Sequence, residues 1–160
     1  MKRKIYFCKS WFRAKKRPTE NWSEEQARAA HGDGLPYTVL VDSVELPYCF
    51  LELTKKTVGV GFLDEHLRES LTYGFQEVEP GKLFLTIATY REFVDDTDKV
   101  ASGTSYMFSR DGAVSIRRES FVPEHKIETS SSVADLAENY SAMPSFGEYD
   151  DLIRVERSQA

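Results

Sequence analysis

The sequence has little of what most catalytic and metal-binding sites are built from. It contains two cysteines and three histidines, and none of them stands in a CxxC, Cys/His or HExxH spacing. No apolar run approaches the roughly 20 residues that a membrane-spanning helix needs. The phosphate-binding GxxxxGK[ST] loop and the GxSxG turn of serine hydrolases are missing too. These absences argue against a zinc protein, a membrane protein and the commonest hydrolases and nucleotide-binding proteins.

The two cysteines, Cys8 and Cys49, each lie in an apolar segment that is typical of a strand. We expect buried free thiols in a reducing cytoplasm, and a disulfide only if the two strands are neighbours. Further Lys and Arg residues interrupt the basic N-terminus before any apolar stretch of about 7 to 15 residues, so we expect no secretory signal. A nucleophilic thiol paired with a distant histidine stays open as a minor alternative.

Acidic residues are missing from the start of the chain. Residues 1–17 contain eight Lys or Arg and no acid, whereas the other positions hold 13 basic and 26 acidic residues, a net charge of about −13. A basic arm that also carries Trp11 and Phe12 is typical of a surface that binds single-stranded nucleic acid. The acidic body opposes such a partner, because it repels phosphates. The apolar residues of the arm favour its docking against its own domain.

Short segments that alternate apolar and polar residues run from 36 to 119 and are separated by turn-forming residues. This period of two predicts an antiparallel meander. Pro80 and Gly81 stand where a type II turn requires them, so we expect a hairpin between 71–78 and 83–93.

Two helices are expected to flank the sheet. Ser23 and Gln26 form a capping box that predicts a helix over 24–31, ended by Gly32. The serines at 130–132 predict the start of a second helix near the C-terminus.

We therefore predict an α+β fold, a single domain with an antiparallel meander sheet of five to seven strands packed by an N-terminal and a C-terminal helix. The domain is expected to span 1–160, with a basic aromatic N-terminal segment over 1–17 and an acidic C-terminal tail over 145–160.

Polar clusters offer weak candidates for chemistry. The densest spans 64–69 and contains one histidine, His66, without the second histidine that a zinc protease needs. A solvated turn is the favoured interpretation. The acidic loop at 95–98 lacks the glycine and the glutamate of an EF-hand. We therefore expect no catalytic residue, no metal site and no cofactor.

A compact sheet without chemical motifs is more typical of recognition than of catalysis. We hypothesise a non-catalytic cytoplasmic protein that binds another protein, in one version an immunity-type inhibitor whose acidic surface blocks a basic partner. No membrane partner is expected, and homo-oligomerisation stays open. The candidate partner-binding residues are acids and one neighbouring aromatic residue: Glu148, Tyr149, Asp150, Asp151, Asp95, Asp96 and Asp98.

Two other functions stay open. The first is an enzyme or a small-ligand carrier with a pocket between the sheet and its helices. The second is nucleic-acid binding through the basic N-terminal segment. A ligand pocket would use a strand with a bare glycine face, which marks a bend, a bulge or a groove. Its residues would be Gly59, Gly61, Tyr73, Phe75 and Tyr90.

Overall fold

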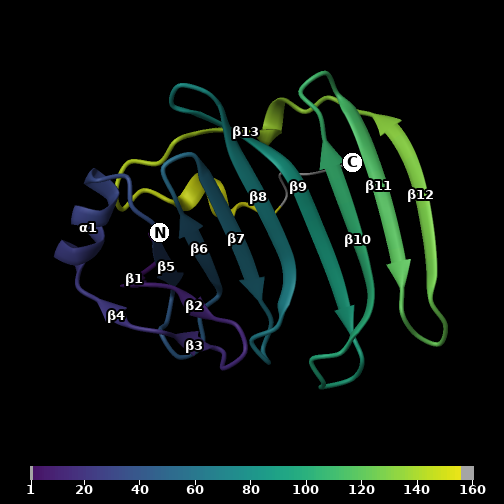
Figure 1. Cartoon of the computed structure of the whole chain (residues 1–160), viewed down its shortest axis with the longest axis horizontal. Coiled ribbons are helices and arrows are strands. Elements are labelled where there is room, and N and C mark those ends of the chain that lie inside the picture. Colours follow the sequence, from purple (N-terminus) through teal and green to yellow (C-terminus); the bar gives the residue numbers. More distant parts are fainter. Residues whose placement is uncertain (1, 156–160) are drawn as a thin grey trace.

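A computed structural model describes residues 2–155 as one curved antiparallel sheet with a helix at one end (Figure 1). The path through the sheet is β4-β1-β5-β6-β7-β8-β9-β10-β11-β12, and β13 pairs with β9 as the eleventh strand. The strands are β1 Ile5–Cys8, β4 Asn21–Trp22, β5 Tyr37–Val41, β6 Cys49–Leu53, β7 Thr57–Leu63, β8 Glu69–Glu79, β9 Lys82–Phe93, β10 Val100–Phe108, β11 Ala113–Ser120, β12 Lys126–Val133 and β13 Tyr140–Ala142.

Shorter elements complete the chain. They are the two-stranded hairpin of β2 (Trp11–Phe12) and β3 (Arg17–Pro18), the helix α1 (Glu24–Gly32) and the 3-10 turns η1 (Ala137–Asn139) and η2 (Asp150–Ile153). Residue 1 of the expected basic segment and residues 156–160 of the expected acidic tail lie outside the described residues.

The predicted α+β fold with five to seven strands and two packed helices is wrong. The sheet has eleven strands, and α1 is the one α-helix between residues 2 and 155. The serines at 130–132 lie in β12, all eight residues of which pair with β11. Serine is a weak helix former, and the neighbouring Ile127, Thr129 and Val133 favour a strand, so the ladder with β11 decides the conformation.

The predicted N-terminal helix is confirmed. The Ser23 hydroxyl accepts a hydrogen bond from the Gln26 amide nitrogen at 3.1 Å, and Gln26 Oε1 accepts one from the Ser23 nitrogen at 2.8 Å. These two bonds form the capping box. Ala27 and Ala30 are buried, and the helix contacts β1, β4 and β5. The helix therefore covers the end of the sheet where β4 lies.

The predicted hairpin between β8 and β9 is confirmed as well. Glu79 pairs with Lys82 across the turn, and Gly81 has a φ of 76°. Only glycine adopts such an angle without strain at this position of a type II turn. The two strands have 11 and 12 residues, so they form the long central ladder of the sheet.

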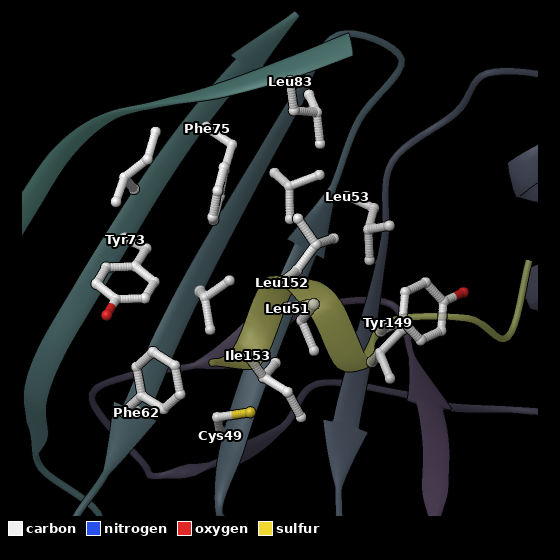
Figure 2. Close-up of a cluster of buried hydrophobic side chains, with 14 of the residues drawn as sticks. Cys49, Leu51, Leu53, Phe62, Tyr73, Phe75, Leu83, Tyr149, Leu152 and Ile153 are labelled. Carbon is white, nitrogen blue, oxygen red and sulfur yellow. The ribbon is translucent and has the colours of Figure 1, made fainter. Parts of the chain in front are cut away.

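The two faces of β5 and β6 are covered by different segments. On one face, η2 packs Leu152 and Ile153 over the strand residues Leu51 and Cys49 (Figure 2). On the opposite face, the β2–β3 hairpin stacks Trp11 on Phe50, with ring centroids 5.8 Å apart. Strands buried on both faces need apolar residues at successive positions, which explains why β5 is buried at all five of its residues.

The basic N-terminal segment is docked as part of this architecture. β1 pairs with β4 and β5 inside the sheet. Arg13 forms ion pairs with Glu52 at 2.6 Å and with Glu69 at 3.1 Å, and Lys16 pairs with Asp98 at 2.7 Å. Several cations of the segment therefore neutralise acids of the same chain.

Gly61 offers a test of the packing beneath the hairpin. It pairs with Phe50 across β6 and β7, and a Cβ atom on Gly61 would collide with the Phe50 ring. We predict that Gly61→Ala lowers the free energy of unfolding by about 1–3 kcal/mol, because the fully buried ring has no room to move. Equilibrium unfolding in urea measures this change.

Gly59→Ala is the matched control, since its Cβ would lie 3.7 Å from Glu52 Oε1, an ordinary contact. Its stability is expected to stay close to that of the parent protein. Equal losses in the two variants would contradict this account of the hairpin.

Candidate functional site

The acids expected to bind a partner fall on two separate parts of the structure. Asp95, Asp96 and Asp98 occupy the turn between β9 and β10. There Asp98 pairs with Lys16 at 2.7 Å, and Asp96 Oδ1 lies 3.4 Å from His66 Nε2. The turn is thus joined to the β2–β3 hairpin and to the β7–β8 turn, and Asp95 is exposed beside them.

The second group lies in the C-terminal segment around η2. Glu148 pairs with Lys2 at 3.0 Å, Asp150 is exposed, and Asp151 pairs with Arg154 at 2.9 Å. Tyr149 is buried. The two groups do not form one acidic surface.

Tyr149 holds the C-terminal segment against the core. Its hydroxyl oxygen lies 2.8 Å from that of Tyr37, which in turn lies 2.9 Å from His31 Nδ1. Burial raises the pKa of both phenols, so both hydroxyl groups stay protonated and available for this hydrogen-bond chain. The chain links η2, β5 and α1.

The expected pocket residues are divided between the two faces of the sheet. Tyr73 and Phe75 point into the core beneath η2 (Figure 2). Tyr90 pairs with Leu71 and therefore faces the same side. Gly59 and Gly61 alternate with core residues of β7 and face the opposite side. Gly59, Gly61 and Tyr73 line one hollow, whereas Phe75 and Tyr90 do not border it.

The two thiols are also kept apart. Cys8 in β1 and Cys49 in β6 are separated by β5 and belong to apolar clusters on opposite faces of the sheet. Burial raises the pKa of the Cys8 thiol to about 12 and also raises that of Cys49. Thiols of this kind are poor nucleophiles, because the thiolate is the reactive form.

We predict that both cysteines resist alkylation in the native protein. Iodoacetamide at pH 8 is expected to label them at least about tenfold more slowly than in urea, since each unit of raised pKa removes about nine-tenths of the thiolate. Mass spectrometry after timed quenching measures the labelling. Rapid modification of either cysteine without denaturant would contradict the buried placement.

Residues 64–68 form the expected turn, and Glu69 begins β8. Asp64 Oδ1 accepts hydrogen bonds from the backbone nitrogens of His66 at 2.9 Å and Arg68 at 3.0 Å. The three histidines lie on α1, in the β7–β8 turn and in the β11–β12 turn. Between residues 2 and 155, no three His, Cys, Asp or Glu side chains are grouped so that they could hold a metal ion.

A different surface lies at the other end of the sheet, beyond the two covering segments. One side of β9–β12, opposite the side that carries the core residues, is accessible in the described chain (Figure 1). We call it the open face. The cross-strand register places its side chains in rows, such as Thr89, Ser105, Arg117 and Thr129. Its members are Ile87, Thr89, Arg91, Ser105, Met107, Ser115, Arg117, Glu119, Phe121, Ile127, Thr129, Ser131 and Val133.

Large apolar side chains are exposed on the open face. The exposed fraction is 38% for Ile87, 40% for Met107, 43% for Phe121, 49% for Ile127 and 81% for Val133. Hydroxyl-bearing residues lie between them. Several large exposed apolar residues on one side of a sheet are a property of interaction surfaces, whereas single exposed apolar residues are ordinary.

Three adjoining hollows meet at Arg91. Their volumes are about 220, 290 and 330 Å³, and Arg91 lines all three. The third is also lined by Gly59 and Gly61, so the glycine strand does border a groove. Gly103 lines the first.

Arg91 differs from the neighbouring cations in its partners. Its Nη1 donates to Thr72 Oγ1 at 3.4 Å, and no carboxylate of residues 2–155 forms an ion pair with it. Arg13 is held by Glu52 and Glu69, and Arg117 by Glu119 at 3.4 Å. The hollows therefore converge on a cation that is free to take an anionic partner.

Sequence reasoning missed most of this site. The Ser and Thr residues of β9–β12 resemble the solvated side of any amphipathic sheet, and the serines at 130–132 predict the start of a helix rather than the end of a strand. The glycine pattern in β7 was the one available signal.

No family model, curated protein or solved structure matches the chain. Within the described residues, no helix is both long enough and apolar enough to span a membrane.

Proposed function

We propose that this protein is a non-catalytic module that binds another protein through the open face. The observation that carries the proposal is the exposure of five large apolar side chains on one side of β9–β12, where the described chain supplies no cover. A partner that covers them removes apolar area from water, worth roughly 25 cal/mol for each Å². The hydroxyl groups between them supply hydrogen bonds at an otherwise apolar contact.

Arg91 specifies the chemistry of the partner. A guanidinium that forms no ion pair within residues 2–155, placed where three hollows meet, favours a partner that inserts an Asp or Glu side chain or a chain terminus. Met107 and Ile87 are cross-strand neighbours on the same face and offer an apolar contact. We therefore propose a partner that presents a carboxylate flanked by apolar side chains.

The version with an acidic surface that blocks a basic partner draws no support from the placement of the acids. Asp98, Glu148 and Asp151 each face a cation of their own chain. Those cations compete with a basic partner for the same carboxylates. The carboxylates that line the hollows with Arg91 are paired with Arg13, Lys16 and Arg117, and none of residues 2–155 forms an ion pair with Arg91.

A small anionic ligand is the second candidate function, and the hollows around Arg91 favour it. Each hollow is at or below the low end of the roughly 300–1,000 Å³ of typical ligand pockets. Such a ligand would depend on Arg91 but not on the distant apolar residues of β10–β12. The two functions therefore respond differently to substitution.

The experiment purifies the tagged full chain from its native host and identifies any protein that co-purifies in stoichiometric amount. Calorimetric titration with the purified partner then compares Met107→Lys and Arg91→Gln with the parent chain. Each substitution is expected to weaken binding at least about tenfold, the effect of losing a central interface residue.

Leu46→Lys is the matched control, because Leu46 is 66% exposed in the β5–β6 turn and lies outside the open face. It is expected to bind like the parent. If neither Met107→Lys nor Arg91→Gln changes the affinity for the partner, the proposed surface is refuted. A ligand lost only with Arg91→Gln would establish the second candidate.

A further inference from the structure

β12 forms one edge of the sheet, and its outer side has no strand beside it in the described chain (Figure 1). All eight residues of β12 are exposed. The opposite edge is β4, which has two residues and contacts α1. The long free row of backbone N–H and C=O groups therefore belongs to β12 alone.

Residues 129–133 of this edge lack the features with which proteins usually prevent strand addition, whereas Lys126 and Glu128 lie in its first half. Such features are proline, a β-bulge, a charged side chain or a covering helix. The ladder between β11 and β12 runs through eight residue pairs without a shift. The stretch 129–133 contains neither proline nor a charged residue. A second strand can therefore add to β12 without distorting it.

The residues of β12 one and three positions from Ser130 match in kind on its two sides. Ile127 and Val133 stand three positions before and after it, with Glu128, Thr129, Ser131 and Ser132 between them. Directly opposed residues of an antiparallel pair point to the same face. If two copies of β12 pair about Ser130, Ile127 of each copy faces Val133 of the other, and Thr129 faces Ser131. The pairing covers both apolar side chains, which are otherwise exposed on the open face.

Neighbouring registers fit less well. A two-fold axis at Glu128 would place two carboxylates opposite each other, and like charges in that position are destabilising. An axis at Thr129 would oppose Ile127 to Ser131 and leave Val133 uncovered. The axis at Ser130 opposes Glu128 to Ser132, so no like charges meet.

We propose that the chain forms a two-fold symmetric dimer in which β12 pairs with β12 of a second copy, centred on Ser130. The interface is isologous, as closed dimers require. It joins the two sheets into one, covers Ile127 and Val133, and leaves Ile87, Met107 and Phe121 of each open face accessible. The dimer does not depend on the proposed function of that face.

The seam uses one strand from each copy. It therefore buries less surface than the roughly 800 Å² per partner of a standard interface. The dimer is therefore expected to dissociate on dilution, with a midpoint in the range of about 10–100 μM. Sedimentation equilibrium of the full chain measures this. A monomer mass maintained up to about 500 μM would overturn the proposal.

Charge substitutions at the axis test the register. Ser130→Lys places two ammonium groups opposite each other, and Ser130→Glu places two carboxylates there. Each variant alone is expected to be monomeric at concentrations where the parent is dimeric. An equimolar mixture is expected to restore the dimer, because the charges then attract across the axis.

Ser115→Lys is the matched control, since Ser115 is an exposed serine in β11, one strand inside the edge. It is expected to dimerise like the parent, and circular dichroism checks that all variants are folded. A dimer that survives both Ser130 substitutions, or a mixture that stays monomeric, would refute pairing centred on Ser130. If Met107→Lys abolishes the dimer instead, the dimer uses the open face. That result would also refute pairing centred on Ser130.

Discussion

The structure depends on the burial of β5 and β6 on both faces by two segments that are far apart in the sequence. Successive residues of a strand point to opposite faces, so Phe50 and Leu51 meet different covers: Trp11 on one side and Leu152 and Ile153 on the other. These contacts hold the N-terminal hairpin and the C-terminal segment in place. The strands beyond β9 extend from this two-sided core as a ladder without the same cover.

The docking of the hairpin also explains the uneven charge of the sequence. Exposed ion pairs contribute only about 0–1 kcal/mol each, so the burial of Trp11 is the main stabilising contact and the ion pairs of Arg13 orient it. The hairpin in this position supplies Arg13 and Lys16 to the hollow that borders Arg91. The basic segment thus forms part of the wall of this hollow. Its cations Arg13 and Lys16 form ion pairs within the same chain.

The two ends of the sheet consequently differ in how far other segments cover them. The end with α1 is closed by a helix, whereas the end with β12 exposes a face and an edge. The face carries apolar side chains around Arg91, and the edge carries free backbone groups. A side-chain surface selects a partner by its shape and charge, whereas a backbone edge accepts any compatible strand. The two surfaces therefore support two separate interactions, one with a different protein and one with an identical chain.

Local patterns in the sequence determined the elements whose signals are complete within a few residues. The capping box of Ser23 and Gln26, the Pro80–Gly81 turn and the alternation in 57–63 each specify a conformation through bonds or angles between near neighbours. Tertiary structure alone decided that 130–132 is a strand, that Gly59 and Tyr73 face opposite sides, and that Arg91 forms no ion pair with any carboxylate of residues 2–155. Each of these depends on pairing or covering by residues far along the chain, and the free energy of such contacts exceeds the weak local preferences of serine, glycine and arginine.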